Sequence, residues 1–212
     1  KHTPEISFTN EATRSEVMAN AYFLRAYCYF TLVRVFGDCP LLTSGFESEK
    51  QEDMYPSRTA ASEVYAQVET DIEEALRLMP ASSKLLHKAS PAAINMLRTE
   101  YYLWKAKRLG GGNAALSTAQ SSVDAVLKAG YTLLPTFADI FNLNNEANSE
   151  LIWTLPYIVN ENVTPGTSPN FFAYYLAPNG DRTRLREAGY TEDEVPAGSH
   201  AQYVVPTQAY CD

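Results

Sequence analysis

The chain has 212 residues, of which 45% are hydrophobic, and its 17 Lys and Arg residues against 25 Asp and Glu residues give a net charge of −8. This length and hydrophobic content suffice for one or two compact domains with a substantial core, so an overall disordered chain is excluded. No basic cluster offers the positive footprint that nucleic acid requires, and no apolar run approaches the roughly 20 residues that span a bilayer.

The first predicted element is a long helix over residues 14–36, whose side chains fall in two neighbouring rows at helical spacing. The first row contains Met18, Tyr22, Arg25, Tyr29, Leu32 and Phe36, and the second contains Phe23, Ala26, Tyr27, Phe30 and Val33. A helix with one exposed face needs a single apolar row, so two rows predict a helix covered from two directions. Gly37 is expected to end this helix as a left-handed cap, and Pro40 to prevent its continuation.

A second helix is predicted over residues 59–79, after a loop over residues 43–58. Its apolar stripe consists of Val64, Val68, Ile72, Ala75, Leu76 and Met79. On the opposite face, Glu73 has the spacing to pair with Arg77. The first two helices therefore predict a helical hairpin with a long insertion.

Two further helices are predicted on either side of the glycines at residues 110–112. Ser90-Pro91 is a favourable start for the third helix, which reaches about Arg108. The fourth helix covers residues 114–129, with Asn113 as its expected cap and with Ala115, Ala119, Val123, Val126 and Leu127 facing inward. We therefore expect a mainly α fold of tetratricopeptide-like helix pairs, an α-solenoid, with a generic helix bundle as the alternative.

The character of the sequence changes after Tyr131. Residues 137–141 predict a short helical turn, residues 151–157 alternate like a short strand, and the chain from residue 160 is rich in Pro, Gly, Asn and aromatic residues. We therefore divide the chain into a helical scaffold over residues 1–135 and a loop-rich segment over residues 136–212. The second segment is expected to pack on the scaffold and to be incomplete.

A series of short motifs runs along the chain in a defined order and spacing. They are Phe23-Leu24-Arg25-Ala26, Leu32-Val33-Arg34-Val35-Phe36-Gly37-Asp38, Pro40-Leu41, Tyr55-Pro56-Ser57-Arg58, Asp71-Ile72-Glu73-Glu74-Ala75, Met79-Pro80, Ala89-Ser90-Pro91-Ala92-Ala93, Gly130-Tyr131, Asn148-Ser149-Glu150-Leu151-Ile152-Trp153 and Pro206-Thr207. Together they resemble the signature of the SusD/RagB family, the surface-exposed glycan-binding lipoproteins of Bacteroidetes. The resemblance is good over residues 15–160 and weaker after them.

The resemblance implies tetratricopeptide-like helices, non-catalytic binding of an oligosaccharide, and delivery of that ligand to a SusC-like TonB-dependent transporter of the outer membrane. Family members carry a lipoprotein signal and further chain on both sides. Lys1-His2-Thr3-Pro4 shows neither an apolar signal region nor a lipobox cysteine. We therefore expect an internal portion of a cell-surface protein, which meets the membrane only through a lipid anchor absent from this chain.

The acidic residues and histidines do not favour catalysis. Asp71, Glu73 and Glu74 lie along the second helix, and the acidic run at residues 192–194 is expected to be solvated in a charged loop, so neither group predicts carboxylates paired across a cleft. His2, His87 and His200 lack the spacing of a metal site. We therefore expect no catalytic residue and no metal.

Glycine and cysteine usage gives no further site. The glycines at 110–112 lack the Lys-Ser/Thr of a phosphate-binding loop, so we expect no cofactor. Three cysteines are an odd number, and Cys28 and Cys39 are expected to be small buried free thiols, with a bridge between them as the alternative.

Arg25 is the most conspicuous polar residue of the helical part, because it interrupts an apolar row. A buried guanidinium requires a partner. We expect a structural ion pair or a carbonyl clamp, with Asp71 as the candidate partner.

Aromatic residues continue beyond the helices, where no core periodicity requires them. Sugars offer flat apolar faces with hydroxyl rims, which suit aromatic rings and amide groups. The predicted ligand contacts are Tyr157, Asn160, Tyr174 and Tyr175, and the resemblance adds Tyr55 and Arg58. The alternatives are that Trp153 belongs to the core, that Tyr55 packs on the second helix and that Arg58 pairs locally.

Two other functions remain open at this stage. The helices could hold a protein partner, such as the transporter, without any affinity for sugar. A glycoside hydrolase is the more distant alternative, because it would need two carboxylates at a defined separation.

Overall fold

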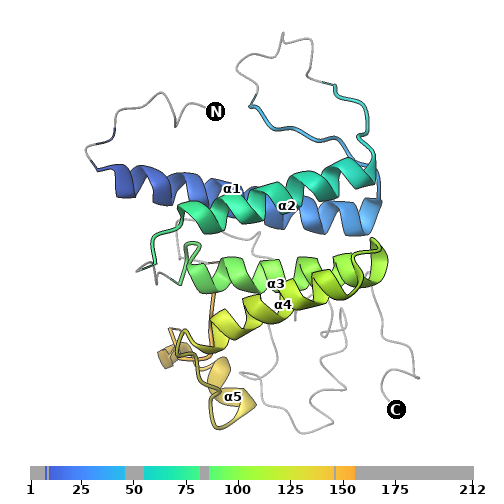
Figure 1. Cartoon of the computed structure of the whole chain (residues 1–212). Coiled ribbons are helices and arrows are strands. Elements are labelled where there is room, and N and C mark those ends of the chain that lie inside the picture. Colours follow the sequence, from blue (N-terminus) through green and yellow to red (C-terminus); the bar gives the residue numbers. More distant parts are fainter. Residues whose placement is uncertain (1–7, 9, 46–54, 82–85, 146, 156–212) are drawn as a thin grey trace, which may run out of the picture. The chain divides into compact units, whose positions relative to one another are not determined.

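The computed structural model describes residue 8 and residues 10–45, 55–81, 86–145 and 147–155. The chain divides into two units, residues 1–155 and 156–212, and every described residue belongs to the first. In this unit α1 lies along α2, and α3 lies along α4, so that the long helices form two hairpins (Figure 1). The mainly helical fold of stacked helix pairs is therefore confirmed.

The elements follow the predicted order. They are α1 (Glu11–Phe36), α2 (Ala61–Leu78), α3 (Pro91–Arg108), α4 (Gly112–Leu127), the short α5 (Phe137–Ile140) and a 3-10 turn (Leu143–Asn145). Within the described part of the chain, no helix is both long and apolar enough to cross a membrane.

Side chains account for two of the helix starts. The Oδ1 atom of Asn10 accepts the N–H of Ala12 at 2.8 Å, and the Oγ atom of Ser90 accepts the N–H of Ala93 at 3.1 Å, which satisfies amides that have no partner inside the helix. The Ser90-Pro91 start is thus confirmed. The prediction for Asn113 was wrong, because α4 already begins at Gly112 and has no side-chain cap.

Only one of the two predicted rows of α1 is fully covered. Four members of the second row are buried, while Tyr27 is 40% exposed. In the first row Leu32 and Phe36 are 39% and 65% exposed, and the remaining four are half-buried. The prediction that both rows are sheathed was therefore wrong at the C-terminal end of α1, because periodicity shows which side chains share a face and not whether a neighbour covers that face.

The inner face of α4 is largely as predicted. Ala115, Ala119 and Val126 are buried, but Leu127 is 73% exposed. Successive helical residues point about 100° apart, so the inward direction of Val126 turns Leu127 away from the core. Cys28 is an exposed free thiol, contrary to prediction, whereas Cys39 is buried and free as expected.

The segment after α4 returns to the helices without forming the predicted strand. The helical turn at α5 is confirmed, but residues 151–155 have no strand structure. The N–H of Thr154 donates to the carbonyl of Leu86 at 3.0 Å, which ties this segment to the loop before α3. The first compact unit ends at Leu155, and the division into scaffold and loop-rich segment at residue 135 stays a prediction.

Candidate functional site

The turn after α1 caps the start of α2. Gly37 has a φ of 69°, which favours glycine, and its N–H donates to the carbonyl of Val33 at 3.0 Å. The following Asp38 accepts the N–H of Ala61 at 2.8 Å through Oδ1. The residue before α2, Ala60, provides no side-chain cap, so Asp38 satisfies one of the free amides of that helix from across the connection.

The two ends of the α1–α2 connection are joined at their base. The N–H of Thr59 donates to the carbonyl of Cys39 at 3.0 Å in an isolated antiparallel bridge. Arg58 donates from Nη1 to the carbonyl of Asp38 at 3.5 Å. This contact agrees with the alternative from the sequence, in which Arg58 pairs locally instead of contacting a ligand. Burial raises the pKa of the Cys39 thiol, which favours the protonated, unreactive form. Pro40, the next residue, is exposed.

Tyr55 lies at the outer end of the returning part of this connection. It is 91% exposed, so the alternative in which it packs on the second helix was wrong. An open tyrosine ring can stack on the apolar face of a ligand, since nothing in the described chain occupies its surface. Its role as a ligand contact stays a prediction.

The ion pair expected between Arg25 and Asp71 is present and joins α1 to α2. The Nε and Nη2 atoms of Arg25 each lie 2.6 Å from a carboxylate oxygen of Asp71, and Gln67 donates to Oδ1 of the same carboxylate at 2.8 Å. The hydrogen bonds to Asp71 raise the pKa of Arg25 above its ordinary value. Asp71 is 1% exposed, so this bidentate pair is structural.

Two other acidic residues of α2 also form ion pairs. Glu73 lies 2.8 Å from Nε of Arg98 on α3, and Arg77 pairs with Glu74 at 2.7 Å. The predicted pair of Glu73 with Arg77 was therefore wrong, because a partner on a neighbouring helix takes the carboxylate. Among the described residues no group of His, Cys, Asp or Glu is arranged to hold a metal ion.

A polar cluster centred on Glu69 fastens α2 to α3. Lys105 places Nζ 2.7 Å from both carboxylate oxygens, and the hydroxyls of Tyr102 and Tyr101 donate at 2.9 and 3.0 Å. Burial alone would raise the pKa of Glu69, but the hydrogen bonds from Lys105 and the two tyrosines outweigh it and lower that pKa. Burial and the nearby carboxylate raise the pKa of both tyrosines. Sequence reasoning missed this cluster, whose members are far apart along the chain.

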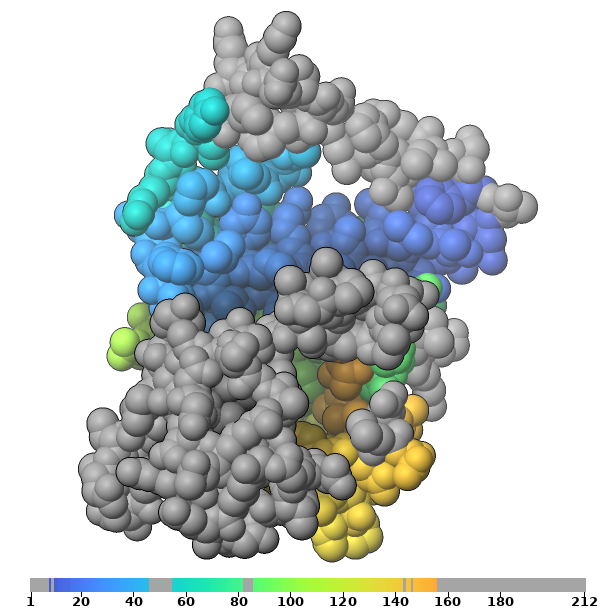
Figure 2. Space-filling view, turned by 180° about the vertical axis from the view of Figure 1, so that it is seen from behind, coloured from blue at the N-terminus to red at the C-terminus, as the bar shows by residue number. Residues whose placement is uncertain are grey.

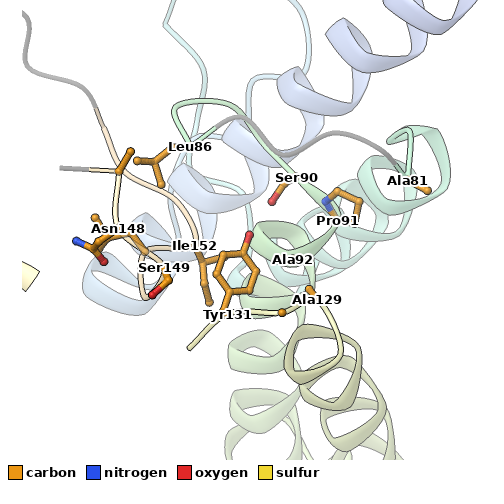
Figure 3. A pocket seen from close by; sticks show the side chains of 13 residues that line it. Ala81, Leu86, Ser90, Pro91, Ala92, Ala129, Tyr131, Asn148, Ser149 and Ile152 are labelled. Carbon is orange, nitrogen blue, oxygen red and sulfur yellow. The ribbon is translucent and has the colours of Figure 1, made fainter. Parts of the chain in front are cut away.

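A cavity of about 350 Å³ lies at the start of α3. Its lining includes Ser90, Tyr131 and Asn148, and the oxygens of Ser90 and Tyr131 point toward one another in Figure 3. Asn148 is 6% exposed, donates to the carbonyls of Ile140 and Asn145, and accepts the N–H of residue 150. Asn148 and Ser149 of the Asn148-Ser149-Glu150 motif therefore line this cavity, a structural use that the sequence alone did not indicate.

A second cavity, of about 490 Å³, lies between α1 and α3 and is mainly apolar. Trp153 packs edge-on against Phe23 and Tyr27, with ring centroids 5.2 and 5.4 Å away. Figure 2 shows the orange segment that ends at residue 155 beside the green surface of α3. Trp153 is half-buried against the core, which favours the structural alternative for this residue.

The remaining predicted contacts lie outside the described residues. They are Tyr157, Asn160, Tyr174 and Tyr175. Of the predicted site, the structure therefore places Tyr55 and Arg58, which lie on the same returning part of the α1–α2 connection.

Comparisons with known proteins agree with this architecture. Residues 5–103 match the SusD-like family described as "Starch-binding associating with outer membrane". SusD-like protein P38 of Formosa agariphila is 32% identical over 196 residues, covering 83% of this chain and 36% of the relative. The solved structure of B. fragilis NanU has a TM-score of 0.73 and 28% identity, covering 84% of this chain and 35% of its own. A laminarin-binding SusD-like protein has a TM-score of 0.59 and 25% identity, covering 71% of this chain and 32% of its own.

These matches concern only part of each relative. The chain spans between 27% and 36% of the length of the curated relatives it matches. The family match over residues 5–103 contains the α1–α2 hairpin with the turn that caps α2, and it ends within α3. The sequence match, the curated relatives and the shared helical architecture together show that the chain belongs to the SusD/RagB family of SusD-like proteins.

Proposed function

We propose that this chain is part of a non-catalytic protein that binds an oligosaccharide at the surface of the outer membrane. The main support is its membership of the SusD-like family, whose description names starch binding and association with the outer membrane. The similarity to a laminarin-binding SusD-like protein adds to that support. Delivery of the glycan to a SusC-like TonB-dependent transporter is part of the same proposal.

Affinity in this proposal comes from aromatic stacking and hydrogen bonding, with no chemical step. Tyr55 stacks on a sugar ring, since its side chain is open to solvent at the outer end of the α1–α2 connection. Arg58 holds the base of that connection through the carbonyl of Asp38. Outside the described residues, we assign further contacts to Tyr157, Asn160, Tyr174 and Tyr175.

The carboxylates support binding rather than hydrolysis. Asp71, Glu69 and Glu73 each receive hydrogen bonds from a cationic side chain. A glycosidase needs one carboxyl group held protonated and a second one placed across the scissile bond. A carboxylate that is neutralised by Arg or Lys in a helix interface is poorly suited to either role.

A glycan array that includes laminarin and starch oligosaccharides tests the proposal on the intact protein that carries this sequence. We expect binding without release of reducing ends, followed by calorimetry on the best ligand. Binding of a purified transporter without affinity for any glycan would favour the protein-scaffold alternative instead.

Substitution of Tyr55 tests its share in binding. The Tyr55→Ala variant is expected to weaken affinity by up to about tenfold, because an aromatic stacking contact contributes about 0.5–1.5 kcal/mol. Phe137→Ala is the matched control, since Phe137 is also an exposed aromatic residue, 78% exposed, on the separate helix α5. Equal affinities of both variants and the wild type would exclude Tyr55 from the site.

A further inference from the structure

The outgoing arm of the α1–α2 connection, residues 38–45, is held along α1 by the side chain of Tyr29. The Tyr29 hydroxyl accepts the N–H of Leu42 at 2.7 Å and donates to the carbonyl of Leu42 at 3.3 Å. One side chain thus occupies both polar backbone groups of a single loop residue. Arg25, already paired with Asp71, lies 3.4 Å from the carbonyl of Thr43 through Nη1.

The returning arm, residues 55–60, is fixed to the outgoing arm at its base. The bridge between Cys39 and Thr59 and the contact of Arg58 with Asp38 join the two arms where they leave the helices. Figure 1 shows both arms extending from the same end of the α1–α2 hairpin. Whatever fixes the outgoing arm therefore also limits where the returning arm, with Tyr55, can lie.

We propose that Tyr29 is a positioning residue for glycan recognition. By binding both backbone groups of Leu42, its hydroxyl sets the course of the outgoing arm and, through the joined base, the place of Tyr55. This inference rests on the proposed function and deepens it, because it adds a residue of α1 that touches no glycan.

The chemistry of Tyr29 separates this role from a general role in stability. Its ring packs against the core, whereas its hydroxyl bonds to Leu42, which is 39% exposed. Loss of exposed hydrogen bonds changes the overall stability little but loosens the local backbone. A looser arm must be ordered when the ligand binds, which lowers the affinity.

The Tyr29→Phe variant tests the proposal, because it keeps the ring and removes only the hydroxyl. Tyr27→Phe is the matched control on the same helix, since the hydroxyl of Tyr27 bonds to no side chain or backbone group within the described part of the chain. Amide exchange is measured over residues 38–45, and the Kd for the best-binding glycan of the array, with laminarin tested first, is measured by calorimetry.

We expect Tyr29→Phe to speed exchange at Leu42 about fivefold and to raise the Kd about threefold or more. The thermal midpoint should stay near that of the wild type, and Tyr27→Phe should match the wild type in all three measurements. Faster exchange with an unchanged Kd, or unchanged exchange, would overturn the positioning role while leaving the proposed function standing. A wild-type protein that binds no glycan would remove both.

Discussion

The two hairpins of the scaffold bring their helices together in different ways. In the α1–α2 hairpin a bidentate ion pair, Arg25 with Asp71, lies across the interface. In the α3–α4 hairpin three of the four buried residues on α4 are small, namely Ala115, Ala119 and Ser122. The first interface thus adds a buried charge pair to its apolar core, whereas the second relies on small side chains that pack closely.

The connections within the two hairpins also differ, in their length and in the contacts that hold them. Residues 109–111 make a short turn between α3 and α4, whereas residues 37–60 separate α1 from α2 and are held by long-range hydrogen bonds. A long connection costs little extra closure entropy, provided that its base is fixed. The hairpin with the long connection is therefore the one that can present an exposed residue such as Tyr55 without disturbing its helices.

The largest expected change in stability comes from removing the charge pair between α1 and α2. Arg25→Met leaves the carboxylate of Asp71, 1% exposed, with Gln67 as its remaining described partner, and we expect a loss of about 3–5 kcal/mol in the free energy of unfolding. Urea denaturation followed by circular dichroism measures this loss. The double variant Arg25→Met/Asp71→Leu should recover much of it, because it removes the uncompensated charge.

The control for this prediction is Arg77→Met, which breaks the exposed pair of Arg77 with Glu74 and should change stability little. If Arg25→Met were as stable as the wild type, the pair of Arg25 with Asp71 would not stabilise the α1–α2 hairpin. The two hairpins would then not differ in the way described above.

The second prediction concerns the close approach in the other hairpin. A Cβ atom at Gly111 would lie 3.0 Å from Cγ and 3.2 Å from the carbonyl oxygen of Lys105 on α3, and 2.8 Å from Cβ of Ala115, although the φ of Gly111 is an ordinary −71°. Gly111→Ala is therefore expected to cost about 1–3 kcal/mol through overpacking. Calorimetric melting measures the cost.

Gly45→Ala is the matched control, because a Cβ atom at Gly45 would meet nothing within 4 Å. We expect its effect to stay within about 0.5 kcal/mol. Equal losses of stability in Gly111→Ala and Gly45→Ala would show that the packing of α4 against α3 does not depend on the small size of Gly111.

The third prediction concerns the polar cluster that joins the hairpins. Glu69→Gln removes the charge that pairs with Lys105 and should cost about 1–2 kcal/mol at pH 7. Because the folded-state pKa of Glu69 is lowered, its contribution is complete above the ordinary pKa of about 4.3 and disappears as the pH falls through the folded-state value. The difference in stability between wild type and variant should therefore close on acidification.

Denaturation at a series of pH values from 7 to about 3 follows this difference. The matched control is Glu74→Gln on the same helix, whose carboxylate faces solvent beside Arg77 and should show a far smaller difference. A Glu69 difference that stays constant with pH would mean that shape rather than charge matters at this contact.

Much of the fold was predictable because it depends on local spacing. The apolar stripe of α2, the Ser90-Pro91 start and the glycine turn at residues 110–112 are patterns within one or two helical turns. The pair of Arg25 with Asp71 was also predictable, since a guanidinium in an apolar row needs a partner and the facing helix carries a carboxylate.

Three of the failures involve partners that spacing does not define. Glu73 binds Arg98 on α3 instead of Arg77, Trp153 packs on α1 instead of forming a strand, and Leu32 remains exposed on a row expected to be covered. In each case the local pattern was read correctly, but the neighbouring surface decided the outcome. The candidate site was less predictable than the fold for the same reason, since the contacts of Tyr29 with Leu42 have no periodic signature.

The smallest expected change in stability comes from removing a helix cap, either the distant cap of α2 or the local cap of α3. Asp38 caps α2 from 23 residues before Ala61, whereas Ser90 caps α3 from the adjacent position. Asp38→Ala and Ser90→Ala should each cost about 1 kcal/mol, since each removes one acceptor from a helix start. Asp38→Asn, which keeps an oxygen acceptor, should cost less.

The two alanine variants should differ in a second measurement, because only Asp38 belongs to the connection that it fixes. Limited proteolysis between α1 and α2 should be faster in Asp38→Ala than in Ser90→Ala, even if their melting temperatures agree. Equal proteolysis would mean that the bridge between Cys39 and Thr59 holds the base without Asp38. A distant cap would then stabilise its helix as a local cap does, and the order of the connection would depend on its other contacts and not on Asp38.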